Sequence, residues 1–252
     1  MNLIDRHWHC SWLIPMNYRW YNCKLFLLLS LSLAGCETLE QAANLGGLTE
    51  PSSVNVSKGL KEALDVGIQR GAQSLSENGY LGTPYQIDLP PEAKVVVDKL
   101  GFLPGMANVG SALQTKLNEA AREAADQAIP IFENAIQDMS FTDARKILLS
   151  DNSEAATDYL EATTYQQLYQ TYHPTIASSL NQVGAQSFWG ELVNRYNQLP
   201  LVEPANADLA DFVTEQALNG LFSKLAVEER AIREDPAQRV SSLMKQVFAL
   251  QD

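Results

Sequence analysis

The chain has 252 residues, of which 18 are Lys or Arg and 30 are Asp or Glu, so its net charge at pH 7 is −12. Hydrophobic residues make up 46% of the sequence, which is typical of a globular protein and excludes a disordered one. The acidity argues against a nucleic-acid partner, because a phosphate backbone requires a basic surface. Three Cys and three His offer little material for a zinc site or a disulfide framework, and we expect no cofactor.

The first 36 residues have the pattern of a bacterial lipoprotein leader. A ten-residue apolar run, 25–34, follows Arg19 and Lys24 and is too short to span a bilayer as a helix. The sequence Leu-Ala-Gly-Cys that ends at Cys36 resembles the lipobox, in which the Cys is lipidated and becomes the mature N-terminus. We therefore expect residues 1–35 to be a signal peptide, and Met16 to be the true start because it gives a leader of normal length. An ordinary signal peptide with a Cys nearby is the alternative.

The residue after Cys36 bears on where the anchor lies. Glu37 is not the Asp that usually signals retention in the inner membrane, which favours the periplasmic face of the outer membrane in a Gram-negative source. Several acyl chains on Cys36 would hold the protein stably, and residues 36–53 would form a flexible tether. Removal of the leader leaves a net charge of −14 and a single His, His173.

From residue 54 to residue 252 the apolar spacing predicts one all-α domain of about eight or nine helices, with a short extended segment near 80–90. We expect a helix over 57–77, a connection with a short strand at 85–89, and a short helix from Pro91 to Leu100. A long helix over 107–138 should be kinked or split by Pro130. Thr142 and Ser153 are predicted to cap two further helices.

The remainder of the chain continues in helical periods. The segment that begins near Thr164 should be interrupted at His173 and Pro174, and another helix should hold the aromatic residues of 188–196. An apolar stripe from 209 to 232 predicts a long helix. Asp235, followed by Pro236, is the expected N-cap of the last helix.

Two carboxylates near the C-terminus are the strongest candidates for catalysis. Glu228 and Glu229 could perform acid–base chemistry if they were buried together, as in a hydrolase. Glu229 and Arg233 are also spaced i, i+4, the ordinary spacing of a helical salt bridge. Convergence of both carboxylates in a cleft would favour the enzyme, whereas pairing with Arg233 and Arg239 would argue against it. No catalytic residue and no metal ligand is therefore assigned.

Aromatic residues gather between 159 and 196. A cleft lined with Tyr rings would suit a lipid, a glycan or a peptide, whereas the same rings could simply pack helix against helix. Phe188 and Tyr196 belong to the same group. The candidate binding residues are Tyr159, Tyr165, Tyr169, Tyr172, Trp189, Glu228, Glu229, Arg233 and Arg239.

Residues 59–248 resemble a bacterial family known only as domain of unknown function 4197. The resemblance rests on blocks that include 59–64, 78–80, 217–222, 228–229, 232–233, 235–236, Arg239 and 247–248. The family pattern Asn-Arg-Ala-Ala-Glu corresponds here to residues 118–122, with the two charges exchanged. A helical salt bridge tolerates that exchange, whereas a catalytic acid would not. The resemblance implies a secreted, often lipid-anchored helical protein and no particular activity.

These observations favour a non-enzymatic outer-membrane lipoprotein that binds a partner. The expected partners are the membrane, through the N-terminal lipid, and an envelope protein, a lipid or a cell-wall component. A hydrolase-like enzyme that uses Glu228 and Glu229 is the alternative. An envelope structural or assembly factor without a small-molecule pocket is a third hypothesis.

Overall fold

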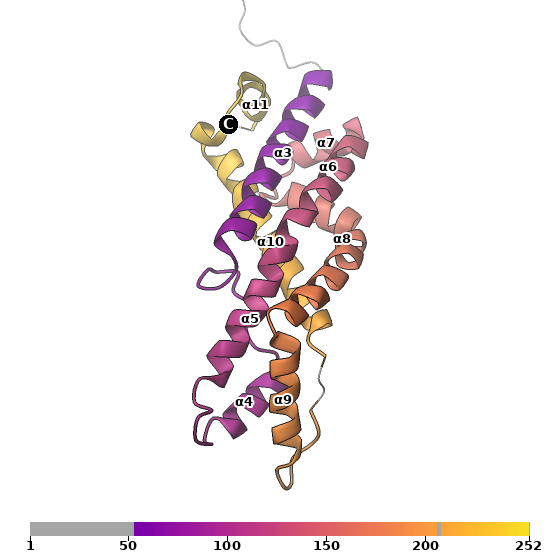
Figure 1. The fold of residues 1–252 in the computed structure, drawn as a ribbon. Coiled ribbons are helices and arrows are strands. Elements are labelled where there is room, and N and C mark those ends of the chain that lie inside the picture. The colour runs from indigo at the N-terminus through magenta and orange to yellow at the C-terminus, as the bar shows by residue number, and fades with distance from the viewer. Residues whose placement is uncertain (1–52, 206–207, 252) are drawn as a thin grey trace, which may run out of the picture. The chain divides into compact units, whose positions relative to one another are not determined.

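The computed structural model describes residues 53–205 and 208–251, all of which belong to the unit Pro51–Asp252. The leader, Cys36 and the tether lie outside the described residues. The described residues form nine α-helices, two short 3-10 helices and no strand, which confirms the prediction of an all-α domain (Figure 1). No helix in this part of the chain is both long enough and apolar enough to cross a membrane. The α-helices are α3 (Ser53–Asn78), α4 (Pro91–Leu100), α5 (Val109–Ala124), α6 (Ala128–Asp138), α7 (Phe141–Leu148), α8 (Ala155–Gln182), α9 (Ala185–Asn197), α10 (Ala210–Glu234) and α11 (Ser242–Phe248).

Helix α3 is central because its small residues allow neighbouring helices to approach closely. It contacts α5, α6, α7, α10 and α11. A Cβ atom added at Gly71 would lie 2.8 Å from Cδ2 of Leu225 on α10, and one at Gly59 would lie 2.5 Å from Cγ2 of Val247 on α11. Side chains at these two positions would therefore push α10 and α11 away from α3.

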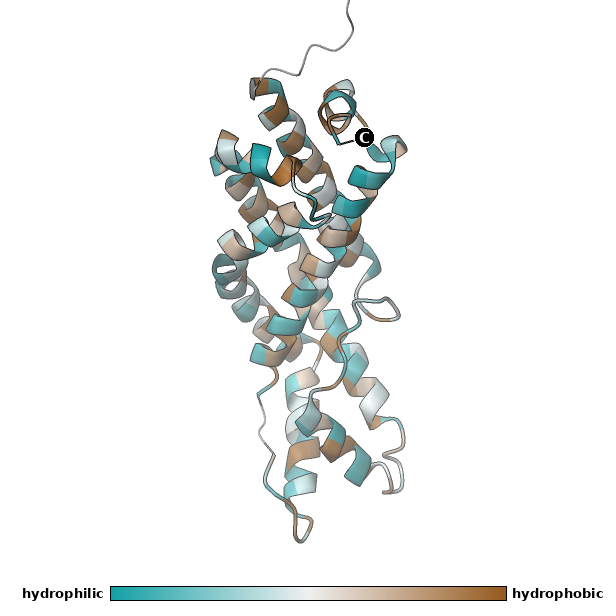
Figure 2. Cartoon of the chain, turned by 180° about the vertical axis from the view of Figure 1, so that it is seen from behind, coloured by the Kyte–Doolittle hydropathy of each residue, from teal (hydrophilic) through white to brown (hydrophobic). Residues whose placement is uncertain are grey.

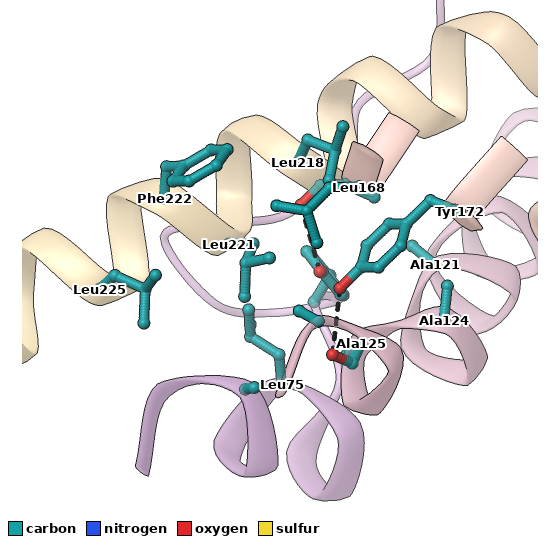
Figure 3. Close-up of a cluster of buried hydrophobic side chains, with 14 of the residues drawn as sticks. Leu75, Ala121, Ala124, Ala125, Leu168, Tyr172, Leu218, Leu221, Phe222 and Leu225 are labelled. Atoms are coloured by element: carbon teal, nitrogen blue, oxygen red, sulfur yellow. Dashed lines mark hydrogen bonds between the residues drawn. The ribbon is translucent and has the colours of Figure 1, made fainter. Parts of the chain in front are cut away.

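The core between α8, α10 and the α5–α6 junction is shown in Figure 3. Tyr172 of α8 points into it, and its hydroxyl donates a hydrogen bond of 3.0 Å to the carbonyl of Ala125. Leu218 and Leu221 of α10 and Leu75 of α3 belong to the same cluster of hydrophobic side chains, and all are buried. Every buried side-chain nitrogen and oxygen in the described residues has a hydrogen-bond partner, as expected for a well-formed interior.

The predicted long helix is split, but the break precedes Pro130. Helix α5 ends at Ala124, a 3-10 turn spans Ala125–Gln127, and α6 begins at Ala128. Pro130 therefore occupies the first turn of α6, where its missing N–H costs little.

Helix α8 runs through Pro174, so the predicted interruption at His173 and Pro174 is wrong. Pro174 lies on an exposed part of the helix, whereas Tyr172 and Ile176 on either side of it are fully buried. Burial of this continuous apolar stripe outweighs the loss of one backbone hydrogen bond. The predicted helix start at Thr164 is also wrong, because Thr164 lies within α8. The Thr164 hydroxyl donates a hydrogen bond to the carbonyl of Leu160, one turn earlier in the same helix.

Several predicted caps are displaced by a few residues. Ser140 rather than Thr142 caps α7, through a bond from the amide N–H of Asp143 to its hydroxyl. Asp235 caps only the 3-10 helix Pro236–Gln238, and Ser241 caps α11. The N-cap position of α8 is occupied by Glu154 rather than by the predicted Ser153, and the Glu154 side chain makes no capping bond.

The connection from Gly79 to Pro90 is irregular, without the expected strand at 85–89. Its anchor is the buried side chain of Asn118 on α5. The Asn118 amide accepts from the N–H of Ile87 and donates to the carbonyl of Ile87, both at 2.8 Å. The side-chain amide thus satisfies the backbone of Ile87 as a neighbouring strand would, and no second strand is needed.

Candidate functional site

The buried polar residues of the C-terminal region meet at the N-terminus of α8. The Glu229 carboxylate, on α10, accepts hydrogen bonds from the N–H groups of Ala156 and Thr157 at 2.9 and 2.8 Å. It also accepts from the Thr157 hydroxyl at 2.9 Å and from Nε of Arg233 at 2.9 Å. Glu229 therefore caps α8 from another helix, at the end where the helix dipole favours negative charge.

Arg233 and Arg239 extend this arrangement to α7 and α11. Arg233 is buried beside Glu229 and donates to the carbonyl of Ile147, in the last turn of α7, at 3.1 Å. Arg239 donates to the carbonyls of Ile232 and Arg233, at the end of α10, and lies over the Phe248 ring of α11. We call Thr157, Glu229, Arg233 and Arg239 the cap cluster, because it satisfies the ends of three helices.

Glu228 is directed away from the cap cluster. Its carboxylate lies 2.6 Å from Nζ of Lys224, one turn earlier on α10. The cavity beside Glu229 is small, about 30 Å³, and mostly apolar, which is room for about one water molecule. With the Glu229 oxygens engaged and Glu228 paired with Lys224, these two residues do not present a pair of free carboxylates.

The relation of the chain to other proteins extends over nearly the whole described unit. A family model described as "Protein of unknown function (DUF4197)" matches residues 50–249. The chain belongs to the DUF4197 family. No match was found among curated proteins or among solved structures.

Much of the DUF4197 pattern consists of residues that pack or cap. Gly59 faces Val247, and a Cβ atom at Gly220 would lie 2.8 Å from the ring of Tyr80. Tyr80 is fully buried, and its hydroxyl donates to the carbonyl of Ala217. In the exchanged block 118–122, Arg122 pairs with Glu123 at 2.7 Å. The Gly59 and Gly220 contacts join one segment of the chain to another, whereas the Arg122–Glu123 pair lies within α5 and is exposed.

The predicted aromatic group divides into core and surface residues. Tyr172, Trp189 and Tyr196 are buried, whereas Tyr159, Tyr165, Tyr169 and Phe188 are half-buried. Burial and then the carboxylates of Asp143 and Asp138 raise the pKa of Tyr159. Burial also raises the pKa of Tyr172 well above its usual value.

Three rings of α8 form a partly exposed row, which we call the ring row: Tyr165, Tyr169 and His173. The rings of Tyr165 and Tyr169 stack with centroids 6.5 Å apart, and those of Tyr169 and His173 with centroids 5.8 Å apart. Tyr165 also stacks on Phe222 of α10. The ring row therefore follows the seam between α8 and α10.

Carboxylates surround the ring row. Asp211 of α10 accepts from the Tyr169 hydroxyl at 2.8 Å and lies 2.9 Å from Nε2 of His173. The hydrogen bond to Asp211 raises the pKa of Tyr169 to about 12, with smaller contributions from burial and Glu215. Burial, then Glu215 and Glu161, raise the pKa of Tyr165. In the described residues no group of three or more His, Cys, Asp or Glu could hold a metal ion.

We expect Asp211→Asn to lower the pKa of Tyr169 from about 12 toward the ordinary value near 10, because the charged acceptor is lost. The raised pKa means that the Asp211 contact stabilises the fold below pH 10 and is lost as the pH rises through 12. NMR titration of carbon-13-labelled tyrosine, assigned with Tyr169→Phe, measures the shift. An unchanged pKa in Asp211→Asn would contradict the assigned cause.

Proposed function

We propose that this protein is a non-enzymatic binding module, anchored by lipid on Cys36 to the periplasmic face of the outer membrane. The sequence supports the location: a short apolar run after basic residues, a lipobox, and Glu37 rather than Asp after the Cys. The cap cluster supports a non-enzymatic role, because the strongest candidate carboxylate already accepts four hydrogen bonds within the fold.

The observation that carries the binding role is the ring row. It presents stacked aromatic side chains together with the carboxylates of Asp211 and Glu215. Aromatic faces and carboxylates both attract cations. The ring row therefore fits a basic segment of an envelope protein, with Lys or Arg side chains that lie over the rings and pair with the carboxylates.

An oligolysine peptide tests this chemistry. We expect it to bind the full chain, to broaden or shift the NMR signals of Tyr165 and Tyr169, and to bind at least fivefold more weakly to the Asp211→Asn, Glu215→Gln double variant. The matched control, Glu119→Gln with Glu123→Gln on α5, removes the same charge from another exposed surface and should leave the affinity within twofold. Equal weakening in both double variants would show attraction to net charge alone and would overturn the proposal.

The anchor is tested separately with labelled palmitate in cells. The wild-type chain should incorporate the label and sediment with membranes, whereas Cys36→Ala should lose the label because the acylated sulfur is absent. Cys23→Ala is the control and should keep it. Labelling that survives Cys36→Ala would show that the lipobox interpretation is wrong.

A further inference from the structure

Two loops at one end of the described unit carry fully exposed apolar side chains. Phe102, between α4 and α5, is 88% exposed, and Leu201, between α9 and α10, is 105% exposed. In both views these loops lie at the lower end, whereas α3 begins at the upper end (Figures 1 and 2). Single exposed apolar residues are ordinary, but here two lie at the same end, each on its own loop.

The backbone at Leu201 strengthens this observation. Its φ is 63°, and it is the one residue other than Gly with a positive φ among the described residues. The left-handed conformation is unfavourable for a residue with a Cβ atom, so such an outlier calls for a functional explanation. In this strained conformation the Leu201 side chain is exposed to solvent and makes no packing contacts that would offset the strain.

The charges near both loops are arranged similarly. Residues 101–106 and 198–202 contain no charged side chain. Lys99 lies in the last turn of α4 and Arg195 in the last turn of α9, and both are exposed without an ion pair among the described residues. Asp98 and Glu203 also flank the loops, so the charged residues next to the two loops in sequence, Asp98 with Lys99 and Arg195 with Glu203, balance one another although the chain as a whole is acidic.

We infer that residues 101–106 and 198–202 insert into the surface of a lipid bilayer. A bilayer accepts each projecting apolar side chain independently, whereas a protein partner would need two pockets at a fixed spacing. Apolar side chains backed by cations suit the boundary between acyl chains and phosphate groups. The inference is independent of the ring row, because the two use different residues and different chemistry.

Tryptophan scanning of the full chain tests insertion. Phe102→Trp and Leu201→Trp place a fluorophore in each loop, and Leu250→Trp, after α11, where Leu250 is 42% exposed, is the control. The vesicles contain phosphatidylethanolamine and phosphatidylglycerol. Two arrangements are compared: in the first, the vesicles that anchor the protein carry brominated acyl chains, and in the second, only vesicles added later carry them. The wild-type chain gives the background of its native Trp, which is Trp189 alone once residues 1–35 are removed.

We expect brominated lipid, in one of the two arrangements, to quench the added fluorescence at least twofold in both loop variants and to leave Leu250→Trp unchanged. The arrangement that quenches tells whether the loops enter the anchoring bilayer or a facing one. Absence of quenching in both arrangements, or equal quenching in all three variants, overturns the inference. A fluorescence change in the loop variants that depends on protein concentration without lipid would also overturn it, in favour of contact between two copies.

Discussion

Replacing Glu229 by Ala should lower the free energy of unfolding by about 3–5 kcal/mol, the usual cost of breaking a buried ion pair by removing one partner. The variant leaves Arg233 without its carboxylate in a site where both side chains are less than 10% exposed. It also leaves the N–H groups of Ala156 and Thr157 without their acceptor. Urea unfolding followed by circular dichroism measures the change.

The matched control for Glu229→Ala is Glu228→Ala at the neighbouring position. Glu228 pairs only with Lys224, within the same helix, and both side chains are partly exposed. We expect its loss to cost at most about 1 kcal/mol. Equal effects of the two variants would show that Glu229 does not act as the cap of α8. Wild-type stability of Glu229→Ala would reopen the hydrolase hypothesis, since Glu229 would then be dispensable for the fold.

The second large effect concerns Gly59. Gly59→Ala should lower the free energy of unfolding by about 2 kcal/mol, because the new methyl group would overlap Val247 and force α3 and α11 apart. The greater helix propensity of Ala offsets only part of this cost. Hydrogen exchange should become faster in α11, whose seven residues have few other contacts.

Gly190 on α9 is the control position, at which we expect substitution by Ala to stabilise the protein. No atom lies within 4 Å of a Cβ atom built there, and its φ is not positive. Gly190→Ala should therefore raise the free energy of unfolding by about 0.5–1 kcal/mol, since only the helix propensity changes. If both Gly→Ala variants stabilise the protein, the close approach of α3 and α11 is not real.

Apolar periodicity was sufficient to predict the all-α class and several of the helices. The stripes of α3, α9 and α10 face the core as their spacing indicates, because each has one continuous apolar side. Local signals were less reliable where tertiary contacts compete with them. Pro174 would end an isolated helix, yet burial of Tyr172 and Ile176 holds α8 together around it.

From the sequence alone, Glu229 could be predicted to be either a structural or a catalytic residue, but not which of the two. The spacing of Glu229 and Arg233 allowed both a salt bridge and a catalytic pair, and the deciding contact is with Ala156 and Thr157, which are distant in sequence. Asn118 belongs to the block 118–122 of the family resemblance, but nothing in the sequence indicated its burial, because an Asn within an amphipathic helix looks like a surface residue. The ring row could not be predicted, because the sequence does not show which Tyr rings reach the solvent. Tyr169 and Tyr172 are only three residues apart, yet Tyr169 is half-buried and Tyr172 is buried.

The remote cap of α8 also determines when during synthesis the native contacts of α8 can form. The carboxylate that completes the start of α8 lies 73 residues later in the sequence, and the helix that closes over Gly59 is the last one described. A polypeptide that emerges N-terminus first cannot complete either contact until its C-terminal segment is available. Native packing of α3 and α8 is thereby delayed until the segment from Glu229 to Val247 has been made, so these helices spend that interval without two of their tertiary contacts.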